Sequence, residues 1–203
     1  MIRRMGMIAL AALAPATQAR EVSAETETVL VVLAHPDDEL PMAPAIAALA
    51  RQGRPVTILY ATPGDAGPGV SGLPKGAALA DARRAEAQCA ARALAVAEVG
   101  DLGFGDGRLG DHARDGSLAA ALADQVGAVG TVLTWGPDGG YGHADHRMVS
   151  ALATQVVQAM PAATRPKLLY VGIPAGTLPA VPEMAQWATT DPALLTESIV
   201  YTP

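Results

Sequence analysis

The chain of 203 residues contains few cysteine, aromatic and charged residues. Its one cysteine, Cys89, excludes an internal disulfide and a thiolate-rich zinc site. Aromatic residues make up 3% of the chain and the net charge is -6, whereas a protein that binds single-stranded nucleic acid needs stacking aromatics and a basic groove. Charged residues make up 17%, too few for a disordered acidic protein. We therefore expect a folded protein with no nucleic-acid partner.

The beginning of the chain has the pattern of a secretory signal peptide. Residues 1–4 include two arginines, residues 5–14 are almost wholly apolar, and small residues at 14–19 offer a cleavage site. The apolar run is shorter than the ~20 residues that span a bilayer, and no other long apolar run follows. The pattern predicts a signal peptide over residues 1–19, an exported protein (periplasmic or secreted), and one domain over residues 20–203 without a membrane span. The alternatives are an uncleaved anchor and an irregular N-terminus.

The remaining chain alternates between strand-like and helix-like segments. Residues 29–34 form a continuous aliphatic run, which is typical of a strand buried on both faces. Such alternation predicts an α/β fold, with a mainly parallel sheet covered by helices on both faces. Ligands of such sheets bind beyond the carboxyl ends of the strands. Further strands are predicted at 55–60, 132–135, 168–171 and 197–201, and helices at 43–52, 75–96, 117–126 and 143–160.

Polar clusters follow two of these predicted strands. His35-Pro36-Asp37-Asp38-Glu39 comes directly after the first strand, and residues 137–146 place His143 and His146 at a helix start behind a glycine-rich turn. A solvated turn would need neither the histidine nor the third acid of the first cluster. Because neighbouring strands of a parallel sheet lie ~5 Å apart, we expect both clusters to converge on one point.

Imidazole and carboxylate groups without thiolates suit Zn²⁺, with Fe²⁺ or another divalent metal as an alternative. Two histidines and one aspartate would fill three ligand positions and leave a fourth for water, as in a catalytic site. Asp37 would remain as an unligated base. His143 and Tyr141 would remain as donors to a developing oxyanion.

These motifs resemble the LmbE-like, or PIG-L, family of zinc deacetylases. The resemblance rests on residues 34–39 and 143–146, and the Arg83-x-x-Glu86 pair and the Asp106-Gly107 turn are similar to the family as well. It extends from about residue 29 to residue 171 and implies a Rossmann-like three-layer sandwich. The implied activity is a metal-dependent hydrolase that removes the N-acetyl group from an N-acetylglucosamine-type substrate, either a small molecule or a glycan.

The resemblance also assigns roles to individual residues. The metal ligands correspond to His35, Asp38 and His146. The general base corresponds to Asp37, and the group that assists the tetrahedral intermediate or the leaving amine corresponds to His143, tuned by Asp145. The remaining assignments are Tyr141 to the oxyanion and Arg83, Glu86 and Asp106 to substrate binding.

The sequence departs from the family pattern in three places. Met42-Ala43-Pro44 replaces glycines that usually follow the first motif, and Ala144 replaces a proline. Family members usually continue with a further helical segment after the position of Pro203, so we expect a shortened or incomplete C-terminal region. The alternative function is therefore a non-catalytic relative that binds metal or carbohydrate.

Some residues also have simpler interpretations. Residues 105–110 fit G-x-G-x-x-G, but we expect a loop after them and not the helix of a dinucleotide site. Arg83 and Glu86 could form a structural ion pair. Cys89 is predicted to be a small core residue, and Trp135 to pack on the sheet more than to shape a pocket.

Overall fold

The computed structural model describes residues 27–127 and 129–195. The predicted signal peptide and the strand predicted at 197–201 lie outside the described residues. Within them, no helix is long and apolar enough to cross a membrane.

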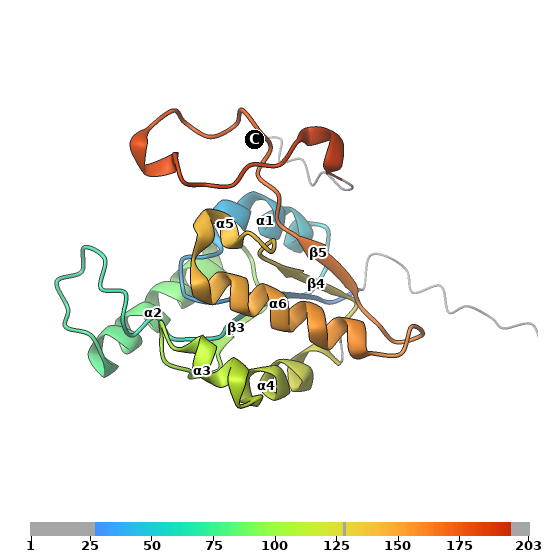
Figure 1. Cartoon of the computed structure of the whole chain (residues 1–203), viewed down its shortest axis with the longest axis horizontal. Coiled ribbons are helices and arrows are strands. Elements are labelled where there is room, and N and C mark those ends of the chain that lie inside the picture. Colours follow the sequence, from blue (N-terminus) through green and yellow to red (C-terminus); the bar gives the residue numbers. More distant parts are fainter. Residues whose placement is uncertain (1–26, 128, 196–203) are drawn as a thin grey trace, which may run out of the picture.

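Five strands form one parallel sheet in the order β3-β2-β1-β4-β5 (Figure 1). The fold class predicted from the alternating segments is therefore confirmed. Strand β3 was not predicted, because Glu98–Asp101 is short, partly polar and half-exposed at the sheet edge. The strand bounds are β1 Val29–Leu33, β2 Val56–Tyr60, β3 Glu98–Asp101, β4 Thr131–Thr134 and β5 Lys167–Tyr170.

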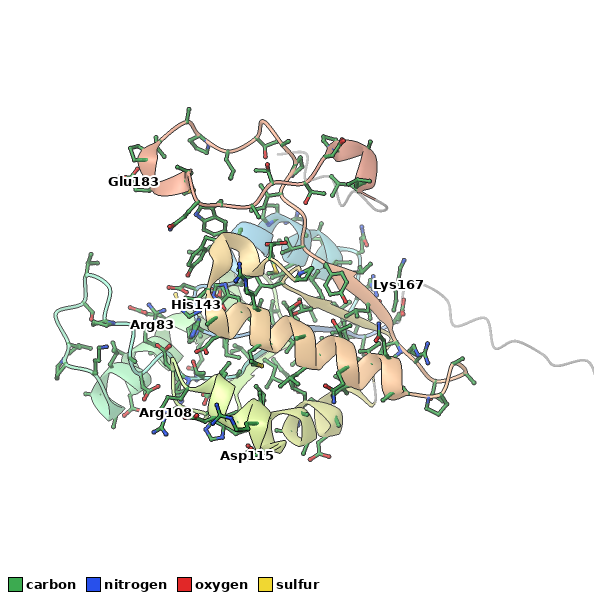
Figure 2. The ribbon with its side chains drawn as sticks, in the orientation of Figure 1. Arg83, Arg108, Asp115, His143, Lys167 and Glu183 are labelled. Carbon is green, nitrogen blue, oxygen red and sulfur yellow. The ribbon has the colours of Figure 1, made fainter. Side chains whose placement is uncertain are left out.

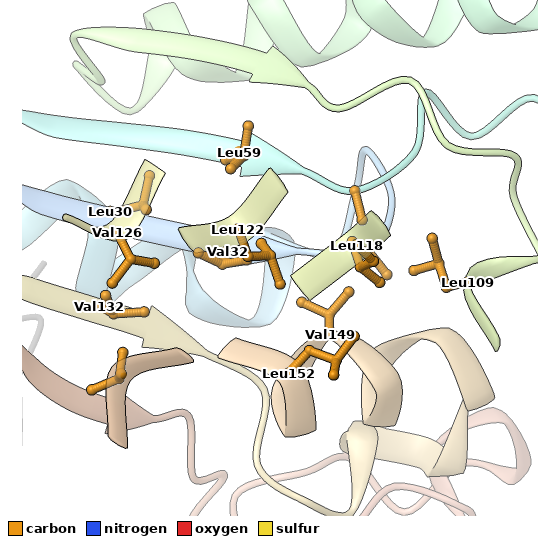
Figure 3. Packing of buried hydrophobic residues seen from close by; sticks show 13 residues of the cluster. Leu30, Val32, Leu59, Leu109, Leu118, Leu122, Val126, Val132, Val149 and Leu152 are labelled. Atoms are coloured by element: carbon orange, nitrogen blue, oxygen red, sulfur yellow. The ribbon is translucent and has the colours of Figure 1, made fainter. Parts of the chain in front are cut away.

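Strand β1 lies at the centre of the sheet, and all five of its residues are buried. Its side chains alternate between two cores, because successive residues of a strand point to opposite faces. Leu30 and Val32 join the core that Figure 3 shows, whereas Val31 and Leu33 join the core on the other face. Buried residues of α3, α4 and α6 belong to the first core and those of α1 and α2 to the second, which confirms a three-layer sandwich.

The helices largely follow the predicted segments, apart from α3, which lies where a loop was predicted, and the short α5, which lies in the predicted glycine-rich turn. The G-x-G-x-x-G segment therefore leads into a short helix, and the prediction of a loop after it, on which a dinucleotide site was rejected, was wrong. In the structure, Asp106 of this segment contacts the first polar cluster, with its Oδ1 3.1 Å from Nε2 of His35. The α-helix bounds are α1 Ala43–Arg51, α2 Ala77–Ala93, α3 Leu109–Arg114, α4 Ser117–Val126, α5 Gly139–Gly142 and α6 Ala144–Ala159.

The face of α2 that packs on the sheet does not include Cys89, which was predicted to be a core residue. Its buried residues are Leu79, Ala80, Ala87 and Ala91, whereas Cys89 is exposed. The prediction of Cys89 as a core residue was wrong. Alanines occur all around this helix, so their spacing does not define one apolar face.

After β5 the chain forms a largely irregular segment, residues 171–195, which we call the C-terminal segment. It contains two short 3₁₀ turns, Pro182–Met184 and Pro192–Leu194. A backbone bridge between Pro174 and Thr190 closes it into a loop. In Figure 1 this loop lies beyond α5 and α1, and the amide of Ala188 donates to the carbonyl of Gly140 in α5 at 2.6 Å.

Candidate metal centre and active site

The two polar clusters follow the neighbouring strands β1 and β4. From β1 the chain continues to β2 and β3 on one side, and it later returns to place β4 on the other side of β1. Ligands of open α/β sheets bind at this kind of reversal in strand order, beyond the carboxyl ends of the strands. The predicted convergence of the two clusters is observed, since the rings of His35 and His146 lie 5.4 Å apart between centroids.

His146 is fully buried at the start of α6 and meets Asp38 without a hydrogen bond. Its Nδ1 lies 3.0 Å from the carbonyl oxygen of Gly139. Because a carbonyl only accepts, Nδ1 carries a proton, and in the neutral imidazole Nε2 then presents a lone pair. Nε2 has no hydrogen-bond partner, yet it lies 2.9 Å from Oδ1 of Asp38. Two electron-rich atoms that are buried at this distance repel each other unless one cation binds both of them.

Asp38 is oriented by the end of strand β1. Its Oδ2 accepts hydrogen bonds from the backbone amides of Ala34 at 3.0 Å and His35 at 2.8 Å. These bonds leave Oδ1 directed at His146. Burial alone would raise the pKa of Asp38, but a protonated imidazole at His146 or His35 outweighs burial and lowers this pKa below its usual value. The group is therefore a buried carboxylate with one oxygen free for a cation.

His35 is surrounded by three carboxylates. Its Nε2 lies 3.1 Å from Oδ1 of Asp106 and 3.3 Å from Oδ2 of Asp145, and its Nδ1 lies 3.6 Å from Oδ2 of Asp38. Burial alone would lower the pKa of this imidazole, but the carboxylates outweigh burial and raise the pKa to about 12. Carboxylates that orient a ligating histidine through its other nitrogen are a common feature of metal sites.

The carboxylates make the site fit a divalent cation. The described residues include two groups that can converge on one ion, namely His35-His143-His146 and His35-Asp106-Asp145. Both groups contain His35 and neither contains Asp38. Imidazole and carboxylate donors without a thiolate match Zn²⁺ or Fe²⁺ better than a soft metal. The Nε2 of His146 without a hydrogen-bond partner and the Oδ1 of Asp38 that faces it are the observations that fit a bound metal.

Asp37 projects from a strained turn beside these groups. Its φ is +94°, a conformation that residues other than glycine rarely adopt and that clusters at functional sites. Its Oδ2 accepts a hydrogen bond of 2.7 Å from Nη2 of Arg83, which also donates to the carbonyl of Pro36. Arg83 thus connects α2 to the turn, and its contact with Glu86 is longer, at 3.9 Å.

Glu39 supports this turn from beneath, a role that was not predicted. Its side chain is buried, and Oε2 accepts hydrogen bonds from the backbone amide of Asp37 at 2.9 Å and from the hydroxyl of Tyr60 at 2.7 Å. Burial and the carboxylate of Glu39 raise the pKa of Tyr60, so this hydroxyl remains a donor. The third acid of the first cluster therefore holds the backbone of Asp37.

Replacing Tyr60 by Phe should lower the free energy of unfolding by about 1–3 kcal/mol, because the buried carboxylate of Glu39 loses a donor. Chemical denaturation measures this change. The matched control is Tyr170→Phe, which removes a 2.7 Å contact with Thr154 at the exposed edge and should change stability by less than about 0.5 kcal/mol. Equal losses in the two variants would contradict the supporting role of Tyr60.

Tyr141 and His143 complete the wall of the site on the β4 side. The ring of His143 lies 4.9 Å from that of His35 and 4.7 Å from that of His146. Burial and the neighbouring His146 and His35 lower the pKa of His143. Burial and Asp38 raise the pKa of Tyr141, which keeps its phenol protonated. A neutral imidazole and a phenolic donor therefore flank the candidate metal ligands.

The glycine-rich turn before α6 brings its backbone against Trp135. Gly140 has φ +75°, and a Cβ there would lie 2.7 Å from the indole of Trp135. The same indole stacks on His146, with ring centroids 4.9 Å apart and planes inclined by 5°. The predicted packing role of Trp135 therefore extends to holding the imidazole of His146, which its position directly after β4 could have suggested.

The predicted site residues fall into three positions. His35, Asp38 and His146 form the buried centre, with Asp106 and Asp145 against His35. Asp37, Tyr141 and His143 line its accessible side, and Arg83 holds the turn of Asp37. Glu86 does not belong to the buried centre, since its side chain is 66% exposed.

The fold and the site together place this protein among the α/β proteins that carry a His/Asp centre at the point where the strand order of a parallel sheet reverses. The family model described as GlcNAc-PI de-N-acetylase (PIG-L) matches residues 30–157. The chain belongs to this family. A curated relative, 1D-myo-inositol 2-acetamido-2-deoxy-alpha-D-glucopyranoside deacetylase from Rhodococcus erythropolis, is 33% identical over 72% of this chain and 58% of its own length. The chain thus spans less than two thirds of this relative.

Solved structures confirm the fold. N,N'-diacetylchitobiose deacetylase from Pyrococcus horikoshii matches with a TM-score of 0.55 and 29% identity, over 65% of this chain and 49% of that one. GalB, the 4-carboxy-2-hydroxymuconate hydratase from Pseudomonas putida, matches with a TM-score of 0.56 and 26% identity, over 72% of this chain and 62% of that one. Because the fold is shared by a deacetylase and a hydratase, the function of this chain has to be argued from its site.

Proposed function

We propose that this protein is a metal-dependent amidohydrolase that removes an N-acyl group, with acetyl as the simplest case, from an amino sugar. The observation that carries the proposal is the buried Nε2 of His146, which has no hydrogen-bond partner and faces Oδ1 of Asp38 at 2.9 Å. The names of the family and of the curated relative support an N-acetylated glucosamine unit as the substrate.

His35, Asp38 and His146 would hold the ion, which we propose to be Zn²⁺, with Fe²⁺ as the alternative. When bound, such an ion polarises a carbonyl and makes water more acidic. Asp106 and Asp145 would keep the ring of His35 oriented through Nε2.

The other residues then divide the proton transfers. The Asp37 carboxylate accepts a proton from the attacking water, whose oxygen bonds to the amide carbon. Tyr141 donates a hydrogen bond to the oxyanion that develops on the carbonyl oxygen. The proton held by Asp37 passes through the neutral ring of His143 to the departing nitrogen as the C–N bond breaks, and the products are a carboxylic acid and a free amine. Arg83 holds Asp37 in place from α2.

Amine release tests this proposal. The chain, dialysed against a chelator and reloaded with Zn²⁺ or Fe²⁺, should release primary amine from N-acetylglucosamine derivatives only after reloading. The measurement is fluorescamine labelling of the amine together with metal analysis. Amine release at full rate after the metal has been stripped would contradict the metal-dependent mechanism. Loaded, folded protein that releases no amine from any N-acylated sugar would favour the non-catalytic alternative.

A further inference from the structure

A cavity of about 440 Å³ opens beside Asp37 and Asp38, and its remaining lining is apolar. Three of the lining residues are aromatic, and four of them, including Trp187, come from the C-terminal segment. The lining includes Trp135, Tyr141, Ile173, Leu178, Met184 and Trp187. A cavity of this size falls within the range of pockets that hold small organic ligands, about 300–1,000 Å³.

The C-terminal segment is fixed against the site, so the cavity has a defined wall. The hydrogen bond from Ala188 to Gly140 joins this segment to α5. The ring of Trp187 lies 5.0 Å from that of Tyr141 and 6.1 Å from that of Trp135. In Figure 2, Glu183 marks this segment, and His143 lies on the body of the molecule below it.

Charged side chains lie against the centre outside this lining. Arg83 donates to Asp37 and Asp106 contacts His35, and neither residue lines the cavity. Asp65 accepts a hydrogen bond from the backbone of Asp106 at 3.0 Å. Sugar hydroxyl groups need polar partners, and their burial against aliphatic and aromatic side chains costs free energy. The sugar therefore belongs on the charged side, and the acyl end of the amide belongs on the apolar side.

We propose that the cavity is an acyl subsite and that the substrate carries an apolar acyl group longer than acetyl. The inference rests on the proposed amide hydrolysis. The methyl group of an acetyl would occupy only a small part of 440 Å³, whereas an acyl chain of six to eight carbons would cover the rings of Trp135, Tyr141 and Trp187.

The test is a series of N-acylglucosamines with acetyl, butanoyl, hexanoyl and octanoyl groups, assayed with the zinc-loaded protein. Specificity, as kcat/KM, should rise by up to about fourfold per methylene until the cavity is filled. The octyl glycoside of N-acetylglucosamine carries its chain at the other end of the sugar and should show no such gain. A rate that falls with acyl length, or an equal gain from the octyl glycoside, would overturn the proposal.

A pair of variants in the C-terminal segment tests the location. Leu178→Asp introduces a charge into the lining and should remove the gain with chain length, so that kcat/KM for the octanoyl substrate falls to the value for the acetyl substrate. Val181→Asp is the matched control, because Val181 is exposed and lies outside the lining. The proposal fails if the Leu178 variant keeps the full chain-length dependence.

Binding without turnover separates this proposal from the proposed function. Both tryptophans of the chain line the cavity, so their fluorescence reports its filling. N-octanoylglucosamine should change this fluorescence at a concentration at least tenfold lower than N-acetylglucosamine does. Such binding without amine release would support the acyl subsite and contradict the proposed hydrolase. Hydrolysis of N-acetylglucosamine without any chain-length dependence in binding or rate would support the hydrolase and contradict the acyl subsite.

Discussion

Replacing Asp37 by Asn is expected to lower kcat by about two to four orders of magnitude, the range that general base catalysis contributes. The amide cannot accept the proton of the attacking water, but its oxygen can still accept the hydrogen bond from Arg83. Asn also tolerates the positive φ of this position better than Ala does. The measurement is steady-state amine release, with metal content and thermal unfolding recorded on the same preparation.

Glu86→Gln is the matched control for this variant. Glu86 is a second carboxylate near Arg83, at 3.9 Å, but it is largely exposed and away from the metal ligands. Its replacement should leave kcat within about twofold and stability within about 0.5 kcal/mol, as expected of an exposed ion pair. An Asp37→Asn variant with wild-type kcat would show that Asp37 is not the base.

The convergence of the two clusters could be predicted because it depends on a short-range pattern. His35 and Asp38 follow β1 within five residues, and His146 begins the helix that follows β4. In a parallel sheet these positions meet at one edge, whatever the details of the loops. The buried run of β1 was equally clear, since every residue from 29 to 33 is aliphatic.

Other contacts could not be predicted because they depend on long-range geometry. Glu39 reaches the amide of Asp37 only because Asp37 adopts a positive φ, and it meets Tyr60 from a different strand. Asp106 reaches His35 from the loop after β3, a strand whose half-exposed polar sequence lacks the usual pattern. The cavity wall comes from a segment with almost no regular structure, for which sequence periodicity carries no information.

The second large effect is expected at His146. His146→Asn should weaken Zn²⁺ binding by at least about 100-fold, because even residues that only orient a ligand cost 10–100-fold when replaced. The Asn side-chain amide can still donate to the carbonyl of Gly139, as Nδ1 does, while the atom that faces Asp38 is removed. Competition with a chromogenic chelator measures the affinity.

Metal-induced stabilisation provides an independent readout for the same variant. At a metal concentration of 1,000 times Kd, wild-type protein should gain about 4 kcal/mol against unfolding, and the variant should gain at most about 1.4 kcal/mol at the same concentration. His112→Asn is the matched control, because His112 contacts Ser117 on the far side of α3 and belongs to neither metal-binding group of the described residues. Its affinity and stabilisation should equal those of the wild type. If His146→Asn bound Zn²⁺ as tightly as that control, the lone pair of His146 would not be a ligand, and the buried contact with Asp38 would have to be an ion pair with a protonated imidazole.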